Sequence, residues 1–216
     1  MADPGLNSLL KWSVENSEAT RNDPTAQTDP KAERDPNRGL DPEVLARLMG
    51  GPSDADRMND AMAAIVSPEV DLENKLIAFD NFEQLIENLD NANNMETLGL
   101  WMPLVQQLDH SEPELQFYAS WCLGTAVQNN IKCQDRCLAT GAVEKLVELA
   151  VSGETPKLRK KATYALSSEV RNYQPGFDTM VKELPAEYRG EDRLDANDME
   201  AVDQIINRLR EAADSS

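Results

Sequence analysis

Residues 112–130 read EPELQFYASWCLGTAVQNN, and residues 155–173 read TPKLRKKATYALSSEVRNY. The two stretches align without a gap, 43 residues apart, and keep a proline, two leucines, an alanine, a valine and an asparagine in register. The matched pairs after the proline are Leu115 with Leu158, Ala119 with Ala162, Leu123 with Leu166, Val127 with Val170 and Asn129 with Asn172. Apolar residues that recur at this spacing lie on one face of a helix. The pattern predicts an amphipathic helix that occurs at least twice.

The repeat extends upstream of these two helices. Leu72 lies 43 residues before Leu115, and the pair Leu104-Val105 is matched by Leu146-Val147, 42 residues later. A period of about 40 to 47 residues, built from two or three helices, is typical of armadillo and HEAT repeats. Each unit has an apolar face that it cannot bury alone, so neighbouring units stack into one core with a broad concave surface. The sequence predicts an all-α, armadillo-like helical repeat solenoid over residues 41–195.

Caps and breakers indicate where the helices begin and end. Asp71 is an N-cap signal for a long helix, and a polar run over residues 90–94 follows that helix. Pro175-Gly176 is expected to break the helix after the third repeat. A last amphipathic helix over residues 196–213, capped by Asp195, is expected to cover the end of the solenoid, because repeat arrays need a polar terminal cap.

The N-terminal part of the chain has a different composition. Residues 1–16 are predicted to form a short helix, because Leu6, Leu9, Leu10 and Val14 recur at helical spacing with Trp12 beside them, but a helix this short is marginal on its own in water. Residues 17–40 contain three Asp-Pro steps among polar residues, and too few apolar residues to offset the entropy of ordering. We therefore expect a short segment followed by a disordered linker.

Composition and charge exclude several classes of partner. The 216 residues carry a net charge of −18, which disfavours binding to nucleic acid or to an anionic membrane surface. Residues 51–100 are the most acidic, and this charge serves solubility or steers the chain toward a basic partner. No apolar run is long enough to span a membrane, and no signal peptide is evident. Three cysteines are too few for a disulfide framework, so we expect a reducing, cytoplasmic or nuclear compartment.

Residues that could carry chemistry are few. His110 is the only histidine, and Cys133 and Cys137 have no further metal ligands at suitable spacing. No phosphate-binding motif is present, so we expect no metal, no cofactor and no enzyme activity. Trp101 and Trp121 are assigned to the core, with contact to a partner as the alternative. The basic run over residues 157–161 is interpreted as a solvated helix face, with a nuclear-localisation signal as the alternative.

Polar residues recur where the repeats end, and they are the candidate partner-binding residues. In a solenoid, equivalent positions line one surface, so these residues could form a ladder of hydrogen-bonding groups. Asparagine also simply ends helices, and the sequence leaves both interpretations open. The candidates are Asn88, Asp90, Asn91, Ala92, Asn93, Asn94, Gln128, Asn129, Asn130, Arg171 and Asn172.

Three stretches, residues 6–17, 68–94 and 124–130, resemble the fungal Fes/HspBP type of nucleotide exchange factor for DnaK-class (seventy-kilodalton) heat-shock chaperones. The resemblance covers about residues 6–174. It implies that the armadillo domain clasps the chaperone's nucleotide-binding domain, opens its cleft and releases ADP, so that ATP enters and client protein leaves. The chain continues for fewer residues after Asn172 than is usual in this family.

The resemblance also implies a role for the N-terminal segment. In the family this segment is thought to occupy the chaperone's peptide-binding site, so Leu9, Leu10 and Trp12 would promote client release. We expect a monomer in the cytoplasm that binds a cytosolic DnaK-class chaperone. The alternative is a generic armadillo adaptor that binds an extended peptide on its concave face. That alternative is disfavoured because Trp101 and Trp121 do not recur at the repeat spacing.

Overall fold

The computed structural model describes residues 51–189 and 194–215, and in these ranges every regular element is a helix. Residues Asp54–Ser216 form a compact unit of their own. The elements are α4 Asp54–Val66, α5 Leu72–Ile86, α6 Leu89–Asn94, α7 Trp101–Gln106, the short 3-10 helix η1 Gln107–Asp109, α8 Pro113–Val127, α9 Ile131–Ala139, α10 Ala142–Ser152, α11 Pro156–Val170, α12 Gln174–Glu183 and α13 Met199–Ser215. The all-α prediction is confirmed.

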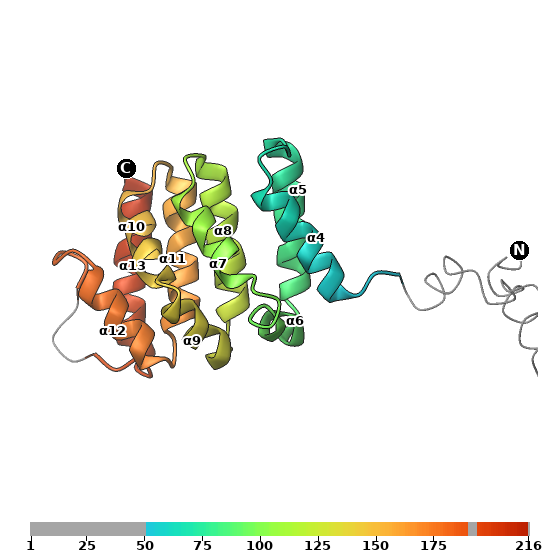
Figure 1. Cartoon of the computed structure of the whole chain (residues 1–216). Coiled ribbons are helices and arrows are strands. Elements are labelled where there is room, and N and C mark those ends of the chain that lie inside the picture. The colour runs from blue at the N-terminus through green and yellow to red at the C-terminus, as the bar shows by residue number, and fades with distance from the viewer. Residues whose placement is uncertain (1–50, 190–193, 216) are drawn as a thin grey trace, which may run out of the picture. The chain divides into compact units, whose positions relative to one another are not determined.

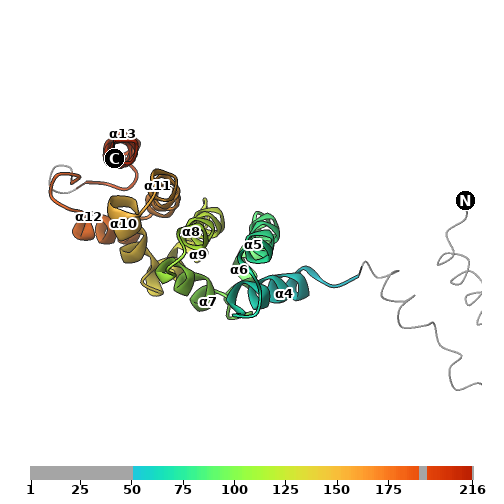
Figure 2. The same cartoon turned by 90° about the horizontal axis from the view of Figure 1, so that it is seen from above.

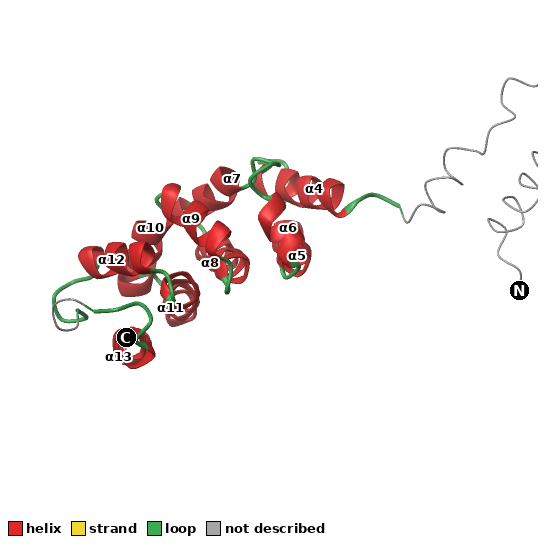
Figure 3. Cartoon of the chain, turned by 90° about the horizontal axis from the view of Figure 1, so that it is seen from below, coloured by secondary structure: helices red, strands yellow, loops and turns green. Residues whose placement is uncertain are grey.

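The helices of this unit form two rows. In the inner row α5 packs on α8, α8 on α11 and α11 on α13. The outer row consists of α4, α7, α10 and α12, and the two rows follow an arc whose hollow side is the inner row (Figure 1, Figure 2). The view from below shows the same stacking (Figure 3). The predicted helical repeats are present, and the side of the inner row that faces away from the outer row is the concave face.

The repeated apolar residues form the contact between successive units. Leu115, Leu123, Leu158 and Leu166 are each exposed by 2% or less. Gly124 permits the close approach of α8 and α11, because a Cβ at this position would lie 2.6 Å from the ring of Tyr164. The core is therefore continuous from one repeat to the next, as the solenoid prediction requires.

The structure of the helix ends explains why capping and helix-ending residues recur in the sequence. The carboxylate of Asp71 accepts a hydrogen bond from the backbone N–H three residues later, and the hydroxyl of Thr155 does the same at the start of α11. Asn129 and Asn172 follow the inner-row helices α8 and α11 with φ of 53° and 56°. Asparagine tolerates this left-handed conformation better than most residues, so it ends the helix in both repeats.

One polar run forms a helix, and one predicted helix break is wrong. The run 90–94 belongs to helix α6, because the side chain of Asn88 accepts hydrogen bonds from the N–H groups of Asp90 and Asn91 and starts a new helix. Pro175-Gly176 does not break a helix but begins α12. Proline is tolerated in a first helical turn, where its missing N–H has no partner to lose.

The last helix begins later than predicted. Asp195 accepts a hydrogen bond from Asn197 in a turn, whereas Asp198 accepts from Glu200 and Ala201 and so caps α13, which begins at Met199. The predictions for segments 1–16, 17–40 and 41–50 lie outside the described residues. None of the described helices combines the length and the apolar character of a membrane span.

Candidate partner-binding surface

A hollow of about 490 Å³ crosses the inner row between α5, α8 and α11. It contains two of the predicted partner-binding residues, Gln128 and Asn129, both exposed. The other lining residues are Glu83, Glu87, Trp121, Thr125 and Tyr164. Residues from three successive inner-row helices therefore converge at one place on the concave face.

The floor of this hollow is fixed by a buried polar contact. Glu83 on α5 is only 5% exposed, and its carboxylate accepts a hydrogen bond of 2.6 Å from the Thr125 hydroxyl on α8. This short hydrogen bond joins α5 to α8 and holds the two helices in register. On the α11 side, Tyr164 packs against Gly124. The hollow is therefore largely preformed.

Aromatic rings extend from the hollow along α8. Trp121 lies 5.8 Å from Tyr118 and 6.2 Å from Phe117, measured between ring centroids, at tilted and edge-on angles that favour attraction between rings. Burial raises the pKa of Tyr118, and the charges of Asp80 and Glu114 add to the effect. Trp121 packs against the core, as predicted, but it is only half-buried and also lines the hollow. Trp101 is 5% exposed, which confirms its assignment to the core.

Two lysines of the basic run lie over these rings. The ammonium nitrogen Nζ of Lys157 is 4.3 Å from the centroid of the Phe117 ring, and Nζ of Lys161 is 4.1 Å from that of Trp121. Burial lowers the pKa of Lys161; Glu83 opposes this shift and the charge of Lys157 adds to it. The interpretation of the basic run as a solvated helix face is wrong for Arg159, which is buried, and for Lys161, which is half-buried, whereas Lys157 and Lys160 are exposed.

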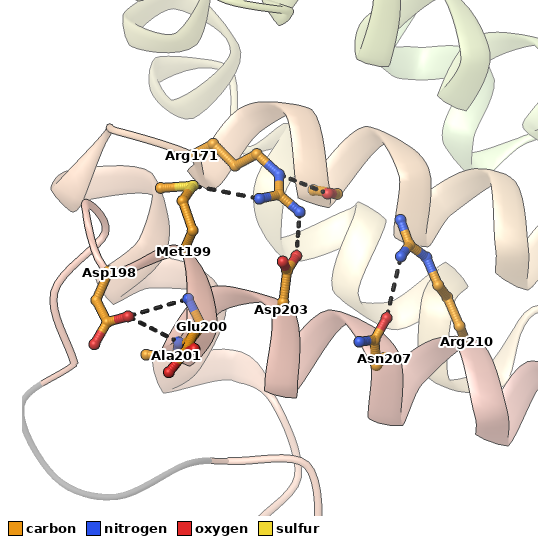
Figure 4. Close-up of polar contacts among 9 residues, drawn as sticks. Arg171, Asp198, Met199, Glu200, Ala201, Asp203, Asn207 and Arg210 are labelled. Carbon is orange, nitrogen blue, oxygen red and sulfur yellow. Dashed lines mark hydrogen bonds and ion pairs between the residues drawn. The ribbon is translucent and has the colours of Figure 1, made fainter.

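The remaining ladder candidates after α11 hold the C-terminal helix. The guanidinium of Arg171 donates to Asp203 and Ser167 and lies 3.4 Å from the Met199 sulfur (Figure 4). The backbone N–H of Asn172 donates to the carbonyl of Ala196, 3.0 Å away. These contacts fasten α13 and the turn before it to α11.

The candidates near α6 and α9 lie away from the hollow, and several have structural roles. Asn88 and Asn130 cap helices α6 and α9. The side chain of Asn91 donates to the Leu85 carbonyl at the end of α5, and Ala92 is 2% exposed in the core. Asn93 lines a separate depression of about 310 Å³ beside Trp101, while Asp90 is exposed and Asn94 half-buried. The contacts of Asn88, Asn91 and Asn130 favour the helix-ending interpretation.

Sequence reasoning missed Glu83, Thr125 and Tyr164. One signal was available: Trp121 and Tyr164 stand 43 residues apart, so an aromatic residue recurs at the same place in two repeats. The contact between Glu83 and Thr125 had no comparable signal, because it joins different positions of different repeats.

A buried carboxyl group lies behind the concave face. Glu169 on α11 is 0% exposed, and neither of its carboxyl oxygens has an aligned hydrogen-bond partner among the described residues. Burial raises its pKa to about 9, with the Cys137 thiol opposing and Asp135 adding to the shift. Cys133 and Cys137 lie on one face of α9 as predicted, and both are buried and free. Burial raises the pKa of both thiols, so they are poor nucleophiles.

Comparison with protein families gives two adjoining matches. Residues 6–95 match the family described as nucleotide exchange factor Fes1, and residues 91–183 match the SIL1/FES1/HPBP1 C-terminal domain. A protein of Gibberella zeae named Hsp70 nucleotide exchange factor FES1 is 57% identical over 98% of both chains. Its namesake in Neurospora crassa is 49% identical over 99% of this chain and 100% of that one.

Other relatives are longer, and solved structures agree on the fold. The FES1 protein of Scheffersomyces stipitis is 42% identical over 82% of this chain but only 60% of its own length. Relatives thus occur both with the length of this chain and with a longer one. The crystal structure of an engineered protein matches 80% of this chain and 71% of its own, with a TM-score of 0.51 and 17% identity, which speaks for the fold alone.

Proposed function

Because this chain belongs to the Fes1 family of Hsp70 nucleotide exchange factors, we propose that its concave face grips the nucleotide-binding domain of a cytosolic Hsp70 chaperone. The chain is a nucleotide exchange factor and co-chaperone, which accelerates ADP release and so promotes client release and folding. The family membership favours this function over the generic peptide-binding adaptor.

One observation supports the concave face as the gripping surface. The hollow across α5, α8 and α11 brings polar and aromatic side chains of three helices together on a floor fixed by the Glu83–Thr125 hydrogen bond. To release ADP, the factor must bind the open, nucleotide-free chaperone more tightly than the closed ADP-bound one. Bound nucleotide then weakens the binding of the factor by the same ratio. A stiff, preformed surface suits this discrimination, because it does not adapt to the closed state.

The proposal assigns no covalent chemistry to the chain. Exchange requires only differential binding, so the chain would act as a monomer without cofactor, metal or catalytic residue. In the described ranges, no three side chains of His, Cys, Asp or Glu come together in a way that could hold a metal ion. The three free, buried cysteines are compatible with a reducing cytosol.

The N-terminal segment has a separate proposed role. Leu9, Leu10 and Trp12 would enter the chaperone's peptide-binding groove and help to free the client. Residues 17–40 would act as a tether that keeps the segment at high effective concentration near the chaperone. The Fes1 family match begins at residue 6 and so includes this segment.

Stopped-flow release of a fluorescent ADP analogue from a cytosolic Hsp70 tests the exchange mechanism. The wild-type chain should accelerate release, and Gln128→Arg should reduce the acceleration because it places a bulky charge in the hollow. Gln106→Arg is the matched control, since Gln106 is exposed on α7 of the outer row. No acceleration by the wild type would refute the exchange mechanism. Equal acceleration by Gln128→Arg would refute the concave face as the gripping surface.

A further inference from the structure

The basic run over residues 157–161 is divided among three different environments. Arg159 is 8% exposed and donates to the carbonyls of Gly153 and Ala213, so it joins α11 to the end of α13. Lys160 forms an ion pair with Asp214 on α13. Lys157 and Lys161 turn to the other side of α11 and lie over aromatic rings of α8. Of these four basic residues, only Lys157 and Lys161 do not help to hold the C-terminal helix α13.

The two lysines on α11 have the same spacing along their helix as two of the aromatic residues on α8. Lys157 and Lys161 are four residues apart on α11, and Phe117 and Trp121 are four residues apart on α8, so each pair lies on one helix face. Lys161 also lies 5.1 Å from the Phe117 centroid and 5.2 Å from that of Tyr164. Trp121 and Tyr164 line the hollow on the concave face. The lysine–aromatic cluster, defined as these five residues, thus forms one edge of that hollow.

The two lysines of the cluster have no direct ionic partner among the described residues. No carboxylate there lies within ion-pair distance of Lys157 or Lys161, although the whole chain carries a net charge of −18. Glu83 raises the pKa of Lys161 from a greater distance, and its carboxylate accepts the hydrogen bond from Thr125. Lys157 is exposed, whereas Lys161 is half-buried, so the ammonium group of Lys161 has lost part of its hydration and regains little of that loss from the rings alone. A carboxylate from outside would complete the site.

We infer that Lys157 and Lys161, held over Phe117 and Trp121, form the docking site for an acidic segment of the chaperone's nucleotide-binding domain. A carboxylate of that segment lies between the two ammonium groups, and an adjacent apolar side chain packs on Trp121 and Tyr164. This inference rests on the proposed function and names the chemistry that the concave face recognises. The charge complementarity carries it: the cluster is cationic on an otherwise acidic chain, so it sets the orientation of the partner.

The geometry gives the cluster the properties of a binding hot spot. Hot spots are enriched in aromatic residues that lie near the centre of an interface, surrounded by weaker contacts that exclude water. The rings also restrict the lysine side chains before binding, which reduces the entropy that docking costs.

The test removes the positive charges of Lys157 and Lys161 and keeps the packing of their side chains on the rings. In the double variant Lys157→Met, Lys161→Met, the apolar stems stay over the rings while both ammonium groups are lost. We expect its affinity for the nucleotide-free nucleotide-binding domain of a cytosolic Hsp70, measured by isothermal titration calorimetry, to fall about tenfold or more, with a shallower dependence on salt. Lys160→Met is the matched control, because it lies on the same helix and its exposed ion pair contributes little to stability. Circular dichroism checks that each variant is folded.

The outcomes separate the inference from the function on which it rests. If the wild type accelerates ADP release and the double variant binds as tightly as the wild type, the inference is wrong and the exchange mechanism stands. Tighter binding by the double variant would show that the cluster faces a basic surface, which also refutes the inference. An equal loss with Lys160→Met would show a non-specific charge effect and refute it as well. If the wild type fails to accelerate release, the proposed function fails first and the inference fails with it.

Discussion

Asn129 and Asn172 occupy the same place in successive repeats, and their backbones share the left-handed conformation with φ of 53° and 56°. Each lies two residues beyond the last residue of an inner-row helix, α8 or α11. At this position the chain must leave the helix and turn toward the outer row, and the positive φ makes that turn. The recurrence of asparagine therefore reflects backbone geometry in both repeats, whether or not Asn129 also contacts a partner.

Substitutions at Asn172 test this relationship, because its side chain is exposed and lies outside the hollow. We expect Asn172→Ala to lower the free energy of unfolding by about 1 kcal/mol, since a Cβ-bearing residue other than Asn or Asp is strained at positive φ. Asn172→Gly should leave the stability unchanged or slightly higher, because glycine adopts this conformation freely. Urea denaturation measures both values. Equal losses in the two variants would show that the side chain of Asn172, and not its φ, is what matters.

The packing around Gly124 predicts the opposite effect of an alanine substitution from the one that helix propensity predicts. Alanine is favoured over glycine within a helix by about 1 kcal/mol, so Gly124→Ala would stabilise an isolated α8. In the solenoid the new Cβ would lie 2.6 Å from the Tyr164 ring and 3.0 Å from the Cα of Ala165. The ring can turn away, but the backbone of α11 cannot, so we expect a net loss of about 1 to 3 kcal/mol. A midpoint of urea unfolding equal to or above that of the wild type would contradict this packing.

Much of the fold was predictable because its signals are local or periodic. The offset of 43 residues identifies α8 and α11, and Asp71 marks the start of α5. Pro175-Gly176 misled the prediction because the same residue pair can end one helix or begin another. Which of the two occurs depends on Tyr173 and Glu169, which pack around Gly176. That packing is a tertiary contact, and the local sequence does not contain it.

The candidate surface was harder to predict than the fold. Gln128 and Asn129 were found because they stand at the end of a repeat, but the hollow depends on contacts such as Thr125 with Glu83, 42 residues apart. The basic run illustrates the same limit. Its residues are adjacent in sequence, yet the helix directs Lys161 toward Trp121 and Lys160 toward Asp214.

Arg171 was predicted to bind a partner, and its contacts now give a way to separate that role from a structural one. Arg171 pairs with Asp203 across the junction of α11 and α13. Because both side chains remain partly exposed, we expect Arg171→Ala and Asp203→Ala each to lower the free energy of unfolding by about 1 kcal/mol or less. A double-mutant cycle by urea denaturation measures the coupling between them.

The same two variants differ in what they do to partner binding. Asp203→Ala frees the guanidinium of Arg171, whereas Arg171→Ala removes it. If Arg171 contacts the chaperone, only Arg171→Ala should weaken binding to the nucleotide-binding domain. Equal effects of the two variants on affinity would assign Arg171 to the attachment of α13 alone.

The buried carboxyl of Glu169 predicts how stability depends on pH. Its pKa is about 9 in the folded chain and near the ordinary value of 4.5 in the unfolded one. Between these two values the folded state keeps a proton that the unfolded state has lost. Its contribution to the free energy of unfolding therefore falls as pH rises, by about 1.4 kcal/mol per pH unit, and levels off above the folded-state pKa. The buried carboxyl therefore favours the folded state most at low pH, where it is protonated in both states. Toward neutral and alkaline pH its burial increasingly lowers the free energy of unfolding.

Glu169→Gln separates this group from the other titrating groups of the chain, because glutamine has nearly the same shape and does not titrate. We expect the variant to be more stable than the wild type at about pH 8, by a margin about 3 kcal/mol larger than at about pH 6. Urea denaturation at both pH values gives the difference, and acidic groups elsewhere cancel in it. Asp135, Cys137 and Tyr173 surround the carboxyl and remain unchanged in the variant. A margin that does not change with pH would mean that Glu169 is ionised in the folded chain, which would require a hydrogen-bond donor or water at a carboxyl group with no exposed surface.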